Sequence, residues 1–195
     1  MIGALLDSES AGEQIDLLGP TFGRAFGMRG GLTIRDADGN DSSASLLQLG
    51  ILFLQPGDLR VPWVSRRMAQ ACAPVMPPGS SIVNVSSVLG LVGPRFPQAS
   101  YAASKAGVIG LTRDLAQEWS GRKGIRVNAL CPGYFRTEMT ADGADALQDL
   151  LARHSILGRF GEQRELDSAL LFLASPASSY VTGTTLTVDG GFTAL

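Results

Sequence analysis

The sequence predicts an α/β fold, a doubly wound parallel sheet, in one domain over residues 1–195. Two observations carry this prediction. Short runs rich in β-branched residues alternate with longer segments whose apolar residues recur at helical spacing, which is typical of strands joined by covering helices. Many of the 24 glycines stand between these segments, where short turns between strands and helices favour them.

The first half of this pattern contains two helices and one strand. Apolar residues recur with a helical period over residues 58–75, and Pro77-Pro78-Gly79 ends that helix. Residues 80–87 read as a buried strand that ends in two serines. After a loop over residues 90–97, we expect a long helix over residues 101–120.

The second half continues the alternation. Strands are expected over residues 124–130 and 184–188, and the first is stopped by Cys131-Pro132-Gly133. Helices are expected between them, over residues 144–153 and 161–174. Because sites in such sheets form beyond the carboxyl ends of the strands, the residues that follow the strands should share one site.

Composition excludes several classes of function. The net charge is −2 and the basic residues are spread along the chain, so we expect neither nucleic acid nor a membrane as a partner. No apolar run reaches membrane-spanning length, and residues 1–9 lack the form of a signal peptide. Cys72 and Cys131 have no metal-ligand spacing and are expected to be reduced thiols in the cytoplasm. A single histidine, His154, cannot build a histidine metal site.

The most informative motif is Tyr101-Ala102-Ala103-Ser104-Lys105, which places a phenol and an ammonium one helical turn apart. A cation about 4 Å from a phenolate is worth about 4 kcal/mol at an effective dielectric constant of about 20. The spacing therefore predicts a pKa for Tyr101 well below the usual value of about 10, where acid–base catalysis is efficient. Ser87, at the end of the preceding strand, is placed to hold a substrate oxygen.

The segments around this motif resemble the short-chain dehydrogenase/reductase family. The resemblance extends from about residue 58 to residue 192 and implies a Rossmann-like fold. The matching phrases are ordered and spaced nearly as in the family, and they cover residues 82–87, 101–105, 125–128, 131–137, 157–161 and 182–191. Any one of them alone is weak, but the ordered set is specific.

The resemblance implies roles for individual residues. Tyr101 matches the catalytic acid/base, Lys105 the lysine that tunes it and binds the nicotinamide ribose, and Ser87 the serine that holds the substrate oxygen, with Ser86 as its substitute. Asp58 stands where the family has an asparagine of the proton relay. Thr137 matches a residue that contacts the nicotinamide, if NAD(P) binds. The loop residues expected to shape substrate choice are Arg95, Phe96, Tyr134 and His154.

The N-terminal part departs from the family. No TGxxxGxG phosphate-binding turn is present in the sequence. The alignment that fits better places the end of the family's third strand at residues 4–7, the following helix at residues 11–22 and its Asn-Asn-Ala-Gly phrase at residues 28–31. On this alignment the fold is shortened at its N-terminus, and residues 1–7 form a short strand near the sheet edge.

Loss of the nucleotide half favours a cofactor-independent enzyme of the isomerase, dehydratase, lyase or cyclase type. It would act on a small carbonyl or phenolic substrate through Ser87, Tyr101 and Lys105, with no cofactor. Three alternatives stay open. They are an NAD(P)-dependent oxidoreductase with a degenerate or partner-supplied nucleotide site, a non-catalytic subunit of a full-length homologous dehydrogenase, and a functionless relic. We expect a homodimer or homotetramer, formed through the helices at residues 58–75 and 101–120.

Overall fold

The structure is a computed structural model. It describes four short strands within residues 15–47 and then residues 61–93, 96–136 and 144–194. The central feature is a four-stranded sheet in the order β4-β5-β6-β7, in which each neighbouring pair is parallel. Its strands are β4 (Leu46–Leu47), β5 (Ser81–Val85), β6 (Arg126–Pro132) and β7 (Thr185–Val188).

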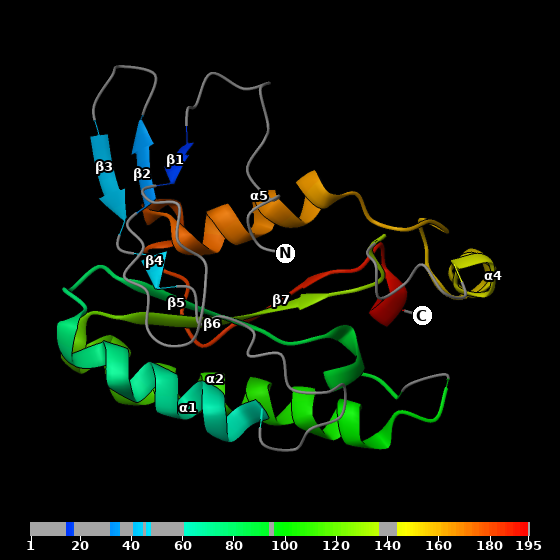
Figure 1. The fold of residues 1–195 in the computed structure, drawn as a ribbon, viewed down its shortest axis with the longest axis horizontal. Helices are drawn as coiled ribbons and strands as arrows, with labels where there is room; N and C mark the ends of the chain where they lie inside the picture. Colours follow the sequence, from blue (N-terminus) through cyan, green and yellow to red (C-terminus); the bar gives the residue numbers. More distant parts are fainter. Residues whose placement is uncertain are drawn as a thin grey trace.

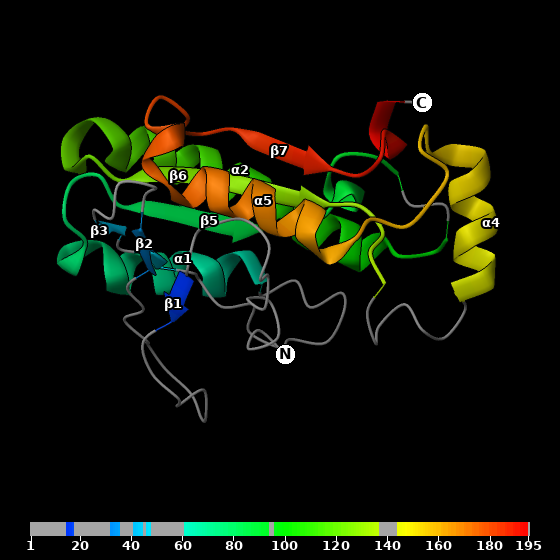
Figure 2. The same ribbon diagram turned by 90° about the horizontal axis from the view of Figure 1, so that it is seen from above.

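Helices cover both faces of this sheet (Figure 1). The helices α1 (Val61–Cys72) and α2 (Ala99–Lys123) lie on one face, and α5 (Gln163–Ala174) lies on the other. The arrowheads of β5, β6 and β7 point toward the end of the molecule where α4 (Ala144–His154) lies, as Figure 2 shows. The prediction of an α/β fold with a doubly wound parallel sheet is therefore confirmed.

Four single turns of 3₁₀ helix accompany these elements in the described part of the chain. The first, η1 (Ala73–Val75), extends α1, and η2 (Val88–Gly90) follows β5 after two residues. Two more flank β7, η3 (Pro176–Ser178) before it and η4 (Phe192–Ala194) after it. The long helix is longer than predicted, because it begins at Ala99 and continues to Gly124, whose φ of 66° ends it in the left-handed region.

The core has one layer on each face of the sheet. Ile82 packs with Leu115 and Trp119 on the side of α1 and α2, so these two α2 residues belong to the core of the chain itself. The next residue of β5, Val83, packs with Leu130 and Leu173 on the side of α5. Successive residues of a strand point to opposite faces, so adjacent apolar residues in β5 serve both layers.

Two buried polar residues of β6 tie the sheet to its neighbours. The Asn128 amide donates to the carbonyl of Val181 at 2.9 Å and accepts from the N–H of Thr184 at 3.1 Å. The Arg126 guanidinium is 8% exposed and donates to two carbonyls at the C-terminal end of α5. These are the carbonyl of Leu173 in the last turn, at 2.9 Å, and that of Ser175, the C-cap, at 3.0 Å. A cation suits the negative end of a helix dipole, so Arg126 stabilises the C-terminus of α5.

The N-terminal prediction is wrong where the structure describes it. Residues Ile15–Leu17 form a strand, β1, where a helix over residues 11–22 was expected. β1 pairs antiparallel with β2 (Leu32–Arg35), which pairs antiparallel with β3 (Asp41–Ala44). The apolar–polar–apolar order of Ile15-Asp16-Leu17 has the period of a strand, and this local pattern outweighs the family alignment. The expectations for residues 4–7 and 28–31 lie outside the described residues.

The described helices were also compared with the length and hydropathy that a bilayer demands. None of them is both long enough and apolar enough to cross a bilayer.

Replacing the buried guanidinium of β6 tests its structural role. Arg126→Met leaves carbonyls at the end of α5 without their donor, so we expect the free energy of unfolding to fall by about 2–4 kcal/mol in urea titrations. The matched control is Arg122→Met on α2, whose side chain is 69% exposed and pairs with Glu118. This change should cost at most about 0.5 kcal/mol, and equal effects of the two variants would contradict the proposed role.

Candidate active site

Three predicted site residues meet at the carboxyl end of β5. Ser87 follows the strand and caps η2, where its hydroxyl accepts a hydrogen bond from the N–H of Leu89 at 3.2 Å. Tyr101 and Lys105 lie in the first turns of α2, one turn apart. The parallel sheet thus brings a hydroxyl, a phenol and an ammonium to one edge, as the topology of such sheets predicts.

The end of β5 and the start of α2 are held in close contact. The hydroxyl of Ser86 donates to the main-chain carbonyl of Lys105 at 2.7 Å. Gly90 faces the same stretch of helix, and a Cβ at this position would lie 2.8 Å from the carbonyl carbon of Lys105. Only glycine allows this close approach, so the contact between η2 and α2 fixes the position of Ser87 relative to α2. Ser86 is thereby used in structure, which leaves Ser87 as the serine of the site.

The Ser87 hydroxyl lies within reach of the Tyr101 phenol, and hydrogen bonding from it lowers the pKa of the phenol. The N–H of Leu89 already donates to the Ser87 oxygen, so the serine proton is available to the phenol. Lys105 extends beneath them, and its Nζ donates to the carbonyl of Val85 at 3.3 Å. Its Nζ lies 5.7 Å from the centre of the Tyr101 ring.

The predicted lowering of the Tyr101 pKa is wrong for this arrangement. Burial raises the pKa of the Tyr101 phenol, and the hydrogen bond from Ser87 offsets only part of that rise. Burial also lowers the pKa of the Lys105 ammonium. The sequence estimate counted the attraction between the two charges but not the loss of water around both. At this separation and burial, desolvation is the larger effect.

A buried thiol next to the lysine was missed by the sequence reasoning. Cys131, the sixth residue of β6, is fully buried and lies close enough to Lys105 for each to affect the other's pKa. Burial raises the pKa of this thiol, so Cys131 is neutral beside the ammonium. The available signal was position, because Cys131 comes directly after the predicted strand over residues 124–130, at the same edge of the sheet as Ser86.

An apolar wall stands beyond the three residues. It is built from η2, α4 and the two segments around Phe160 and Phe192, and its buried members are Val88, Leu89, Leu151, Phe160 and Phe192. Tyr101 and Tyr134 both pack against this wall, each only partly buried. The Tyr134 ring meets the Phe192 ring edge-on, with centroids 5.4 Å apart. Tyr134, one of the loop residues expected to shape substrate choice, therefore lies next to Tyr101 at this wall.

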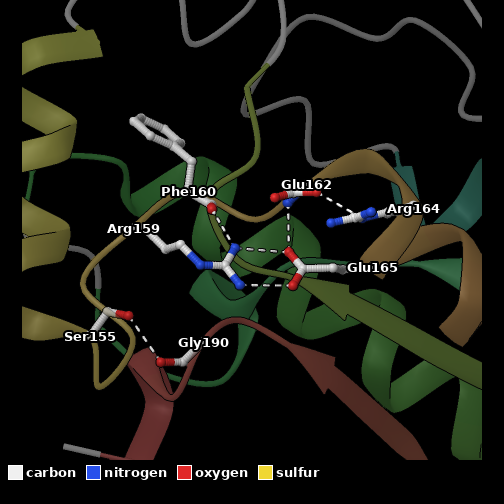
Figure 3. A network of polar contacts seen from close by, with 7 residues as sticks. All are labelled: Ser155, Arg159, Phe160, Glu162, Arg164, Glu165 and Gly190. Atoms are coloured by element: carbon white, nitrogen blue, oxygen red, sulfur yellow. Dashed lines mark hydrogen bonds and ion pairs between the residues drawn. The ribbon is translucent and has the colours of Figure 1, made fainter.

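A polar network fixes the loop that supports this wall (Figure 3). The Arg159 guanidinium makes two parallel hydrogen bonds to the Glu165 carboxylate, at 2.9 and 2.8 Å. Glu165 also accepts from the N–H of Glu162 at 2.7 Å, which closes a capping box at the start of α5. These bonds hold the pKa of Glu165 at about 2. The segment between α4 and α5 is therefore tied to the first turn of α5.

The other predicted residues are less well placed. Phe96 is 44% exposed in the loop before α2. His154 is half-buried at the end of α4, and within the described residues no recorded contact joins it to Ser87, Tyr101 or Lys105. The expectations for Asp58, Arg95 and Thr137 lie outside the described residues.

A parallel sheet with helices on both faces places the chain in the class of Rossmann-type α/β domains. Residues 65–193 match the family model described as enoyl-(acyl carrier protein) reductase. The chain belongs to the short-chain dehydrogenase/reductase family.

Curated relatives match mainly this part of the chain. Galactitol 2-dehydrogenase (L-tagatose-forming) from Cereibacter sphaeroides is 49% identical over 135 residues, which is 67% of this chain and 52% of the relative. The 3-oxoacyl-(acyl carrier protein) reductase of Thermotoga maritima is 50% identical over 111 residues, 57% of this chain and 44% of that protein. The chain spans about half the length of the curated relatives it matches.

Solved structures of dehydrogenases are similar to this chain in fold. A gluconate 5-dehydrogenase from Burkholderia cenocepacia J2315 in complex with NADP and tartrate superimposes with a TM-score of 0.65 at 38% identity, over 73% of this chain and 59% of that one. A putative 2-deoxy-D-gluconate 3-dehydrogenase from Agrobacterium tumefaciens with bound NADP gives 0.61 at 37% identity, over 68% and 54% of the two chains.

These comparisons contradict two predictions from the sequence, a cofactor-independent reaction and the absence of a cofactor. The relatives are named dehydrogenases and reductases, and the two solved structures hold NADP. Both predictions were based on the absence of a TGxxxGxG phosphate-binding motif from the N-terminal sequence. The likeness lies instead in residues 65–193, a range that includes Ser87, Tyr101 and Lys105.

The effect of Ser87 on its neighbour can be measured directly. The chain has three tyrosines, so the absorbance of tyrosinate can be followed with pH and assigned with a Tyr101→Phe variant. We expect the pKa of Tyr101 to stand above its usual value, and Ser87→Ala to raise it further, because the hydrogen bond that stabilises the phenolate is lost. The exposed Ser168→Ala change on α5 is the control and should have no effect. A fall in the pKa on removal of Ser87 would refute this account.

Proposed function

We propose that this chain carries the catalytic site of an NAD(P)-dependent oxidoreductase that interconverts a carbonyl group and a secondary alcohol on a small substrate. The observation that carries the proposal is the convergence of Ser87, Tyr101 and Lys105 at the carboxyl end of β5. The names of the relatives, which are dehydrogenases and reductases, support the same reaction class.

The residues of the chain divide the proton chemistry between them. In the direction of reduction, the Ser87 hydroxyl holds the carbonyl oxygen of the substrate, and the Tyr101 phenol donates its proton to that oxygen as the C=O bond becomes C–OH. The Lys105 ammonium stabilises the resulting phenolate, which then regains a proton from solvent. A nicotinamide cofactor, when bound, supplies the hydride that reduces the carbonyl carbon. The apolar wall around Phe192 excludes water from this exchange.

The described residues fit the nicotinamide end of such a cofactor. Lys105 is largely buried, yet within the described residues its Nζ makes one hydrogen bond, to the carbonyl of Val85. An ammonium has three donors, so two remain for the hydroxyls of a ribose. Lys105 would therefore hold the ribose while it tunes Tyr101, which is the double role that the family resemblance implies.

Cofactor binding and turnover test the function. We expect NADH or NADPH to bind the chain with a Kd below about 1 mM, and carbonyl substrates to be reduced with loss of absorbance at 340 nm. Tyr101→Phe should lower kcat by about 10²–10⁴-fold with little change in cofactor Kd, because it removes the proton donor alone. Tyr180→Phe is the matched control, since that tyrosine is fully exposed.

Two results would contradict the proposal. One is full activity in the Tyr101→Phe variant. The other is failure of the chain to bind either cofactor, alone or together with a longer homologous dehydrogenase copurified from its host. Cofactor binding only in such a complex would favour the partner-supplied version of the nucleotide site.

We also propose that the chain forms a homodimer or homotetramer through α1 and α2. The side chain of Trp63 on α1 is 61% exposed and stacks only with Arg67 among the described residues, at 5.4 Å. An exposed tryptophan beside an arginine is typical of the centre of a protein interface. Light scattering should give a mass of at least twice 20.4 kDa, and Trp63→Ala should lower it. A monomeric mass for the unchanged chain would refute this.

The state of the cysteines bears on the cellular compartment of the protein. Both cysteines are free, Cys72 half-buried and Cys131 buried, which agrees with a reducing compartment. We therefore place the protein in the cytoplasm.

A further inference from the structure

Tyr134 is a second phenol beside the reacting group, with no role in the proton transfer. It follows Pro132-Gly133 at the end of β6 and, like Tyr101, packs against the apolar wall of Val88, Leu89 and Phe192. Burial raises the pKa of Tyr134, and negative charge on the neighbouring Tyr101 phenol raises it further. At neutral pH Tyr134 therefore keeps its proton and can donate it in a hydrogen bond.

The position of Tyr134 is fixed from two sides. On one side its ring meets Phe192 edge-on, at 5.4 Å and an interplanar angle of 68°. On the other side its carbonyl accepts from the N–H of Gly161 at 3.0 Å, and the next residue, Phe135, forms a parallel bridge with Gly161. Gly161 precedes the Glu162 cap, so the Arg159–Glu165 pair in Figure 3 anchors this contact.

A phenol held this firmly loses little conformational freedom when it binds a ligand, which suits it to discriminate between substrates. Tyr134 is only partly buried at the apolar wall, so its hydroxyl is accessible to a ligand there. Within the described residues no side-chain or main-chain group is hydrogen-bonded to this hydroxyl. A substrate oxygen next to the one held by Ser87 and Tyr101 would accept a hydrogen bond from it.

We propose that Tyr134 is a specificity-determining residue that binds a second oxygen on the substrate carbon next to the reacting carbon. The preferred substrates would then be α-hydroxy ketones and the vicinal diols formed from them, rather than simple ketones and alcohols. This proposal rests on the proposed function for the identity of the reacting group. The placement of the two phenols stands independently of it.

The first test measures whether the two phenols interact in the chain alone. The pKa of Tyr134 is followed by tyrosinate absorbance in the Tyr101→Phe variant and, as a control, in the Tyr180→Phe variant. Loss of Tyr101 should lower the pKa of Tyr134, because the neighbouring negative charge is gone. Tyr180 is fully exposed, so its replacement should leave Tyr134 unchanged. No shift in the Tyr101→Phe variant would overturn the shared site.

The second test measures selection by binding, so it does not depend on turnover. Ligand-observed NMR titrations give Kd values for acetoin, an α-hydroxy ketone, and for 2-butanone, which lacks the second oxygen. We expect the unchanged chain to prefer acetoin by about 3- to 10-fold, as one hydrogen bond allows, and Tyr134→Phe to remove that preference. Phenylalanine keeps the edge-on ring contact with Phe192, and unchanged thermal unfolding of the variant confirms its fold. Tyr180→Phe should keep the preference.

The outcomes separate this proposal from the proposed function. Loss of the preference in Tyr134→Phe supports the role of Tyr134 whether or not NAD(P) binds. A preference that survives in Tyr134→Phe, or failure of the unchanged chain to bind either ketone, overturns it even if NADPH binds and simple ketones are reduced. Failure of cofactor binding with an intact acetoin preference would instead count against the oxidoreductase alone.

Discussion

The parallel pairing of β5 and β6 is the constraint on which the site depends. The pairing runs in register from Ser81 and Arg126 to Val85 and Leu130, and the N–H of Ser86 extends it by one more bond to Leu130. Apolar residues on both faces of the sheet disfavour a slipped register, but they do not by themselves select one register. Buried polar residues specify it, because Asn84 donates to Thr112 of α2 and Asn128 bonds across to Thr184. The strand ends that carry Ser86, Ser87 and Cys131 are therefore fixed relative to α2.

Burial sets the electrostatics of the site more than the attraction between its charges does. The same loss of water raises the pKa of Tyr101 and lowers that of Lys105, so it opposes both charges at once. The hydrogen bond from Ser87 is the main recorded force in the other direction for the phenol. A ligand that donates a hydrogen bond to Tyr101 or accepts one from Lys105 would strongly influence proton transfer. Among the described residues these two side chains have few other polar partners.

Much of the fold could be predicted because local and tertiary signals agree. The strand at residues 81–85 is a short buried run that comes after Pro77-Pro78-Gly79, and the helix from Ala99 to Lys123 ends at Gly124. At Ile15–Leu17 a family alignment replaced the local pattern, and the local pattern was correct. The meeting of Ser87, Tyr101 and Lys105 followed from sheet topology, but the pKa of Tyr101 did not, because spacing along a helix contains no information about burial. The link from Gly161 through Phe135 to Tyr134 was also beyond sequence reasoning, since its residues lie far apart along the chain.

That link has a consequence for how related sequences can diverge. A Cβ on Gly161 would overlap the ring of Phe135, so the absence of one side chain makes room for the other. A mutation that enlarges position 161 can be accepted only after position 135 has become smaller, whereas shrinking position 135 first leaves a tolerable void. Substitutions at positions 135 and 161 should therefore follow a preferred order along a lineage. The tolerated intermediate would have a small residue at both positions. Substrate preference set by Tyr134 would drift together with that pair.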